Sequence, residues 1–270
     1  MAMSINTNVG AMIALQNLNK SNAALEKTQL HITTGLKING PKDDAATYAI
    51  AQRMRGDIAG MQAVKTALAA GESTVNVAIT AGKAISNMLT EMKAKVVQAN
   101  QAGLDTDSKQ ALHDDFTALR DQVETIVQTA EFNGKNLITN GGSNLTVLST
   151  VDGSTITVTA QPMDVTTMAI HTVELVTGAS AALASIDTAI NTVTTSLASL
   201  GSSAKRIEVQ TDFTTQLVDI LKEGVGNLVD ADLAEESAAL QSLQIKQQLG
   251  VQALSIANSG PQSILALFGG

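Results

Sequence analysis

The chain has no cysteine, no tryptophan and few aromatic residues of any kind. The absence of cysteine excludes disulfides, thiol catalysis and zinc–thiolate sites. Aromatic residues make up 2% of the 270 residues, so a core has to be built from Ala, Val, Leu, Ile and Met. Charged residues make up 16%, against about 25% in ordinary soluble domains. The net charge of −8 argues against nucleic acid or an anionic membrane as the main partner.

Proline is also scarce, and the three prolines, Pro41, Pro162 and Pro261, are far apart. The long proline-free segments between them permit long helices, because proline breaks a helix interior. Pro261 is expected to end the last helix. No 18-residue apolar stretch exists, so we predict no membrane span. The N-terminus lacks a basic region followed by an apolar run, and we expect no cleaved secretory signal.

Both ends of the chain lack charged side chains. Residues 1–19 and 247–270 contain no Asp, Glu, Lys or Arg, whereas the middle of the chain is charged. Exposed termini usually gather charge and disorder. These uncharged ends are therefore predicted to be buried against something.

A heptad pattern of apolar residues runs through residues 42–100. The same position recurs every seven residues from Met54 to Val96, and only Gly82 interrupts the series. A seam sustained over so many repeats is typical of a coiled coil. Asp44 suits the first turn of this helix, because a negative charge there complements the helix dipole.

The following segments change from helical to alternating patterns and back. We expect Ser108 to be the N-cap of a second helix. Apolar and polar residues then alternate on both sides of Asp152-Gly153, which is typical of a β-hairpin. Helical spacing returns at Ala179 and is expected to break near Gly224, before a last helix over residues 228–258.

Each terminal segment carries two apolar stripes when it is placed on a helix. In the N-terminal segment one stripe is Leu15, Leu18, Leu25, Ile32 and Leu36, and the other is Ile5, Val9, Met12, Ile13 and Leu30. In residues 228–258 one stripe is Leu233, Leu240, Leu243, Val251 and Leu254, and the other is Ile245, Leu249 and Ile256.

The two terminal helices can cover one stripe each by pairing, which leaves the second stripes uncovered. Burying a Leu or Ile side chain contributes about 1.5–3 kcal/mol. A single copy that left these stripes exposed would be sticky and poorly ordered. The stripes therefore predict a subunit whose ends become ordered when copies pack into a polymer.

The histidines and acidic pairs form no catalytic or metal-binding motif. His31, His113 and His171 are scattered, with no H-x-x-H spacing, and we interpret them as solvated surface residues. Helix starts explain the acidic pairs. We predict no catalytic, cofactor-binding or metal-ligating residues, and a protein that is not an enzyme.

Several short motifs stand in a fixed order along the chain. These are S-I-N-T-N at 4–8, T-G-L-K-I-N-G-P-K-D-D-A-A at 34–46, F-N-G at 132–134, Q-Q-L-G at 247–250 and P-Q-S-I-L at 261–265. In this order they resemble the motifs of bacterial flagellins over residues 1–135 and 180–268. Only about 40 residues lie where many flagellins carry large outer domains, so the chain resembles a short form.

The resemblance implies a mainly α fold in which the N- and C-terminal segments form a long antiparallel coiled-coil rod. Residues 1–40 and 227–270 would form an inner coiled coil, and residues 41–226 a rod-like helical domain with a β-hairpin region at 136–178. The implied function is an extracellular structural subunit that polymerises through its terminal helices into the flagellar filament for swimming motility.

The resemblance also implies partners. These are many copies of the same chain, the flagellar type III export apparatus, an export chaperone on the C-terminal segment near 230–268, and the filament cap and hook-associated proteins. No cofactor, nucleic acid or membrane is implied.

One motif departs from the family. The innate-receptor epitope of many flagellins reads L-x-R-V-R-E-L, and the matching stretch here is 89–95. Glu91 stands in place of the key Arg, and Lys95 in place of the later Leu. Charge reversal at a buried contact costs several kcal/mol, so we predict weak or absent recognition by that toll-like receptor.

Two other structural interpretations stay open. A hook-associated junction protein shares the terminal helices, but departs further from these motifs and does not elongate into a long filament. A stand-alone coiled-coil module would stay folded and functional without residues 1–40.

Overall fold

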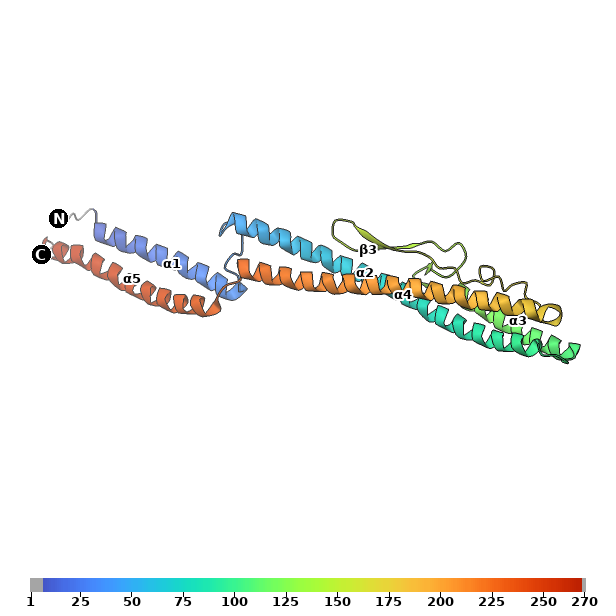
Figure 1. The fold of residues 1–270 in the computed structure, drawn as a ribbon. Helices are drawn as coiled ribbons and strands as arrows, with labels where there is room; N and C mark the ends of the chain where they lie inside the picture. Colours follow the sequence, from blue (N-terminus) through green and yellow to red (C-terminus); the bar gives the residue numbers. More distant parts are fainter. Residues whose placement is uncertain (1–6, 269–270) are drawn as a thin grey trace. The chain divides into compact units, whose positions relative to one another are not determined.

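The computed structural model describes residues 7–268, with the side chains of residues 7–259, and it is mainly helical (Figure 1). The helices are α1 Val9–Thr34, α2 Ala45–Ala99, α3 Thr106–Thr129, α4 Leu175–Val229 and α5 Leu233–Phe268. The strands are β1 Glu131–Phe132, β2 Lys135–Asn136, β3 Leu145–Leu148 and β4 Thr155–Val158. The predicted fold class, long antiparallel helices with a small β-hairpin region, is confirmed.

The chain divides into two compact units. One unit combines Met1–Gly56 with Ile220–Gly270 and contains the α1–α5 pair. The other is Asp57–Asp219 and contains α3 and all four strands. α2 and α4 contribute residues to both units.

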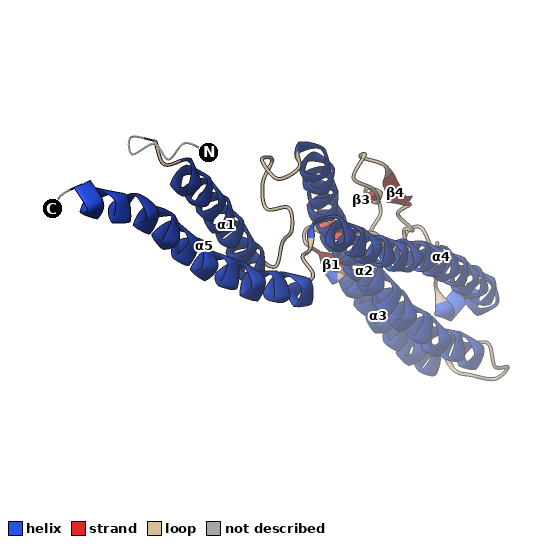
Figure 2. Cartoon of the chain, turned by 90° about the vertical axis from the view of Figure 1, so that its left-hand side faces the viewer, coloured by secondary structure: helices blue, strands red, loops and turns tan. Residues whose placement is uncertain are grey.

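α1 and α5 lie side by side and run antiparallel (Figure 2). Hydrogen bonds between the two segments show the antiparallel order, because residue numbers rise along α1 as they fall along α5. The bonded pairs are Asn8 with Ala257, Asn22 with Gln247, and His31 with Glu236. Just beyond the two helices, Leu36 pairs with Asp230 in an antiparallel bridge. The start of α1 therefore lies beside the late part of α5.

Short polar connections hold this unit together where the helices end. Gly35 ends α1 in a left-handed conformation (φ 70°), which glycine adopts without strain. The backbone N–H of Lys37 then donates to the carbonyl of Val229 (2.7 Å). Asp232 begins α5, because its carboxylate accepts the backbone N–H of Ala234 (2.8 Å).

The core of unit 57–219 is formed by α2, α3, α4 and the strands. Its fully buried side chains include Leu68 and Leu89 of α2, Phe116 of α3 and Ile186 of α4. Apolar residues at helical spacing thus meet on the inner faces of three helices. In this part of the heptad series, Leu68, Val75, Leu89 and Val96 are all fully buried.

The β3–β4 hairpin packs on α2 through small residues. Val147 pairs with Ile156 across the hairpin, and both side chains are buried. The Val147 side chain occupies the space beside Gly71, where an added Cβ would lie 2.5 Å from Val147 Cγ2. Alternation around Asp152-Gly153 therefore predicts this hairpin correctly.

Three predicted helix ends were wrong. α3 begins at Thr106 after Asp105, not after Ser108. α4 continues through Gly224 to Val229. Met54 packs against this glycine, with its Cε 3.0 Å from where a Cβ would stand, and this contact helps to offset the cost of glycine in a helix. α5 continues through Pro261 to Phe268. A proline or glycine costs helix stability, but packing and substitute hydrogen bonds can offset that cost.

Candidate assembly surface

α1 and α5 bury one apolar face against each other. This paired face contains side chains that are half-buried in the structure: Leu18, Leu25 and Ile32 on α1, and Leu240, Leu243 and Leu254 on α5. Leu36, just after α1, is half-buried as well. Gly250 faces Leu18 closely, since an added Cβ would lie 3.2 Å from Leu18 Cδ1, which is tighter than an ordinary van der Waals contact.

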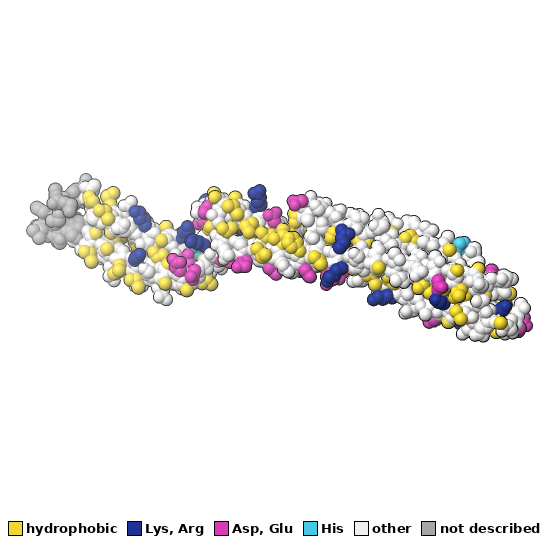
Figure 3. All heavy atoms as spheres, in the orientation of Figure 1, with side chains coloured by type: hydrophobic (Ala, Val, Ile, Leu, Met, Phe, Trp, Pro, Cys, Tyr) yellow, Lys and Arg dark blue, Asp and Glu magenta, His cyan; other side chains and the backbone are white. Residues whose placement is uncertain are grey.

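A second apolar face on each helix is uncovered. These side chains are 45–72% exposed and form what we call the open face: Val9, Met12, Ile13, Leu30, Ile245, Leu249 and Ile256. Figure 3 shows apolar side chains at the surface of this helix pair. On each helix this face lies opposite the paired face, and large apolar side chains gathered on one exposed helix face usually mark an interaction site.

The structure places three residues differently from the predicted stripes. Leu15, Leu233 and Val251 were assigned to the paired stripe, but they are 47–55% exposed. At 100° per residue each lies at the edge of its stripe, and two helices contact along a narrow strip only. Ile5, assigned to the open stripe, lies outside the described residues.

Charge is unevenly distributed along the helix pair. At one end, His31 Nδ1 contacts Glu236 Oε1 at 2.7 Å, and Lys27 Nζ lies 3.2 Å from Asp43 Oδ1. At the other end, residues 9–19 of α1 lie beside the uncharged late part of α5. The prediction that the histidines are solvated was wrong for His31, which is 6% exposed, and for His113, whose side chain is 16% exposed beside Glu174.

Sequence reasoning missed the polar pairs that cross between the two helices. Asn8, Asn22 and His31 on α1 bond to Ala257, Gln247 and Glu236 on α5. The available signal was only that polar residues interrupt the apolar residues of this segment, because Asn22 and His31 would lie on opposite sides of an ideal helix at 100° per residue. That signal does not tell which residue of the partner helix each one meets.

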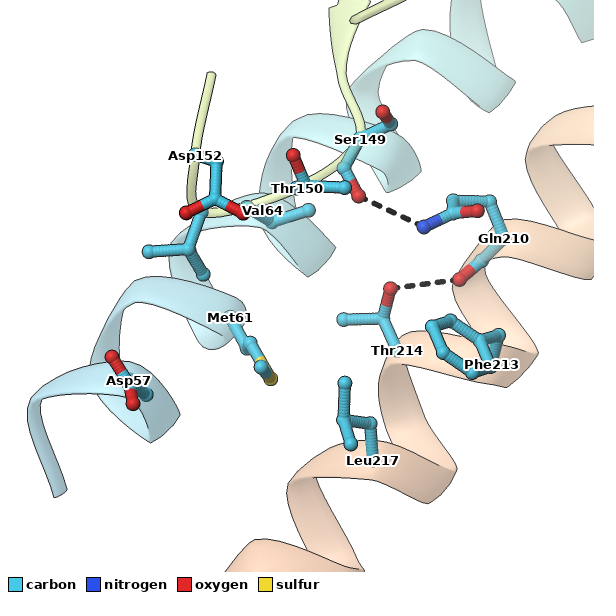
Figure 4. Close-up of a pocket in the computed structure, with 11 residues that line it drawn as sticks. Asp57, Met61, Val64, Ser149, Thr150, Asp152, Gln210, Phe213, Thr214 and Leu217 are labelled. Carbon is cyan, nitrogen blue, oxygen red and sulfur yellow. Dashed lines mark hydrogen bonds between the residues drawn. The ribbon is translucent and has the colours of Figure 1, made fainter. Parts of the chain in front are cut away.

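A groove of about 300 Å³ lies in unit 57–219 between α2, the β3–β4 connection and α4 (Figure 4). Met61 and Leu217 line it, and the Gln210 amide donates to the carbonyl of Ser149 (2.9 Å). The lining has two carboxylates, Asp57 and Asp152, but no histidine or lysine. No nucleophile in it is paired with a general base.

The described part of the chain contains neither a cluster of metal-ligand side chains nor a helix that could span a membrane. Within residues 7–268, no three His, Asp or Glu side chains gather as metal ligands would. Over the same residues, no helix combines the length and apolar character needed to cross a bilayer.

The segment that matches the receptor epitope lies on α2. Leu89 and Met92 are fully buried in the core, whereas Glu91 is exposed. Lys95 Nζ forms an ion pair with Asp115 Oδ2 of α3 (2.6 Å). Of the two departures from the family motif, Glu91 is thus an exposed carboxylate on the surface of α2, and Lys95 is paired with a carboxylate of the same chain.

Comparisons with known proteins agree with the helical ends. Residues 5–142 match the bacterial flagellin N-terminal helical region, and residues 183–268 match the bacterial flagellin C-terminal helical region. Flagellin FljK of Caulobacter vibrioides is 48% identical over 268 residues, which cover 98% of each chain. The chain belongs to the bacterial flagellin family.

Other relatives of this flagellin support the same assignment. A flagellin of Brucella melitensis is 39% identical over 283 residues, with 99% of each chain covered. This flagellin is thus a structural subunit of the extracellular flagellar filament, and the hook-associated alternative is not favoured.

A solved structure described as a putative flagellar hook-associated protein from Vibrio parahaemolyticus shares the fold. Its TM-score is 0.59 at 14% identity, over 70% of this chain and 100% of that one. At that identity the likeness concerns the fold alone.

Proposed function

We propose that this flagellin polymerises through the open face of its α1–α5 pair. The observation that supports the proposal is the 45–72% exposure of large apolar side chains on these two helices. The parts of the helices nearest the chain ends, up to residue 19 and from residue 247, carry no charged side chain. Leu15, Leu233 and Val251 extend this surface at its edges. The paired face, with Leu18, Leu25, Ile32, Leu36, Leu240, Leu243 and Leu254, would present the open face in a fixed geometry.

The energies favour a repeated contact over a single strong one. Complete burial of a Leu or Ile side chain contributes about 1.5–3 kcal/mol, so each half-exposed side chain adds roughly 1 kcal/mol. Ordering and association costs offset much of this sum for one contact. In a helical polymer each copy makes the contact with more than one neighbour, which raises the total for each subunit.

The remaining assignments follow from the family. Residues 1–40 and 227–270 would form the inner layer of the filament, and residues 41–226 the outer layer. The type III export apparatus, a chaperone on residues near 230–268, and the cap and hook-associated proteins would be partners. The proposed role is structural and not catalytic, as the family assignment implies.

We also propose that the receptor that recognises many flagellins responds weakly to this one. Glu91 presents a negative charge where the family motif has Arg. In a receptor reporter assay, the purified protein should give little signal. A response as strong as that of a flagellin carrying Arg at this position would overturn the proposal.

A substitution on the open face tests the polymerisation proposal. Ile256→Asp places a charge on the most exposed residue of the open face, and seeded filament growth should stop. Gln248→Asp is the matched control, because Gln248 is exposed on α5 and lies about 60° or more around the helix from the open-face residues and from the edge residues Leu233 and Val251. Electron microscopy should show filaments for the control, while circular dichroism shows the same helix content for both. Normal filaments from Ile256→Asp would contradict the proposal.

A further inference from the structure

We propose that Asn8 and Pro261 act as a matched pair that sets the register of α1 against α5. Asn8 is then a positioning residue for the helix pair that carries the open face. The inference concerns contacts within one chain, so it does not depend on the proposed polymer contact.

Pro261 removes one hydrogen bond from the interior of α5. In an α-helix the N–H of residue 261 would donate to the carbonyl of Ala257, but proline has no N–H. The Asn8 side chain fills that place, because its Nδ2 donates to the Ala257 carbonyl oxygen at 2.7 Å. The donor comes from the other terminal segment of the chain.

The same amide group caps α1. Asn8 Oδ1 accepts the backbone N–H of Ala11 (3.0 Å), which is the hydrogen bond of an N-cap residue. An amide that directs its oxygen to its own helix start has its NH2 group available for another acceptor. One side chain thus fixes both the start of α1 and its position on α5.

The backbones approach closely at this point. An added Cβ on Gly10 would lie 3.9 Å from Ala257 Cβ and 3.5 Å from Asn8 Oδ1. Both are ordinary van der Waals separations, so the two segments are in contact at position 10, and the short Asn8 amide can reach α5. A longer separation would place the Ala257 carbonyl beyond its reach.

A polar pair is needed here because the neighbouring contacts do not define the register. Leucines at spacings of three and four permit a slip by one turn, and residues 9–19 and 247–259 carry no charged side chain that could fix the register. Asn22 with Gln247 and His31 with Glu236 lie progressively farther from this end. A slip by one turn would leave the Ala257 carbonyl without the Asn8 donor.

The absence of native cysteine allows a direct measurement of the register. The pair Gly10→Cys with Ala257→Cys reports the native register, because a Cβ–Cβ separation of 3.9 Å lies within the disulfide range of about 3.5–4.5 Å. Gly10→Cys with Ala253→Cys reports a register shifted by one turn. The ratio of the two disulfide yields is measured on seeded filaments and on the unassembled full-length chain, so a failure to polymerise does not prevent the measurement.

Two substitutions separate capping from bridging. Asn8→Ser keeps an N-cap oxygen but is too short to reach Ala257. Pro261→Ala returns an N–H for the Ala257 carbonyl within α5. Asn19→Ser, at an exposed asparagine on α1, is the matched control.

The effect of Asn8→Ser should depend on residue 261. With Pro261 present, Asn8→Ser should lower the ratio of native to shifted disulfide several-fold, while Asn19→Ser leaves it unchanged. In the Pro261→Ala background, Asn8→Ser should have no further effect, because the carbonyl no longer needs the asparagine. An equal loss in both backgrounds, or no loss with Pro261 present, would overturn the proposal.

Discussion

At the scale of single residues, close contacts decide positions that a pattern alone leaves unexplained. Gly82 interrupts the heptad series of α2, and it is buried against Leu197 and Met163. An added Cβ would lie 2.8 Å from Leu197 Cδ2. Gly60 and Gly71, on the same face at intervals of eleven residues, make room for side chains of the β-hairpin region in the same way. These glycines serve packing.

Gly71→Ala should destabilise unit 57–219. Its Cβ would lie 2.5 Å from Val147 Cγ2, and such overpacking costs about 1–3 kcal/mol. Gly201→Ala is the control, since nothing lies within 4 Å of its Cβ and alanine favours a helix by about 0.5–1 kcal/mol. The midpoint temperature of thermal unfolding should fall for Gly71→Ala and rise for Gly201→Ala. A Gly71→Ala protein as stable as the parent would refute the packing argument.

Asp44 should make the start of α2 sensitive to acid. Hydrogen bonds from the Thr47 side chain and backbone lower the pKa of Asp44 below its ordinary value of 3.8. A lowered pKa means that the ionised carboxylate contributes stability above the ordinary pKa and loses it as the pH falls through the lower native value. The protection factors of the Ala46 and Thr47 amides, which correct for the slower intrinsic exchange in acid, should therefore fall as the pH is lowered. Asp44→Asn should remove this pH dependence, and an unchanged profile would contradict the role of the charge.

At the scale of elements, strong periodicity of apolar residues predicted helices and strands correctly, whereas single glycines and prolines did not predict where helices end. Seven-residue spacing predicted α2 over 42–100, and the helix is Ala45–Ala99. The hairpin around Asp152-Gly153 was predicted because alternation and turn residues agree. The end of α4 near Gly224 and the end of α5 before Pro261 were wrong, because contacts from distant segments offset the local cost. Sequence spacing also separated the paired from the open face, except at the edges, where pairing geometry decides.

Leu25→Asp should block filament growth from the paired face. Leu25 is half-buried between α1 and α5, so a carboxylate there would be desolvated without a partner. We expect seeded growth, followed by light scattering and electron microscopy, to stop while the helices of residues 57–219 keep their circular dichroism. Asn17→Asp, at an exposed position on the flank of α1 between its two apolar faces, should grow normally. Normal filaments from Leu25→Asp would show that the helix pairing is not needed for assembly.

At the scale of the whole molecule, the two units differ in how completely they cover their apolar side chains. Unit 57–219 buries most of its large apolar residues among three helices and a hairpin, although Val209 and Phe213 of α4 are 56% exposed. The α1–α5 pair has only two helices, so each can cover one face and leaves the other to solvent. The unit with the uncharged chain ends is thus the one that lacks a complete core. This contrast is the physical reason to expect its order to depend on neighbouring copies.

Hydrogen–deuterium exchange of residues 9–34 and 233–258 tests this dependence most directly. We predict fast exchange of these amides in the dilute, unassembled chain, with slow exchange in residues 57–219 of the same sample. In filaments the terminal helices should become protected as well. Equal, strong protection of the terminal helices in the dilute chain and in the filament would contradict the account.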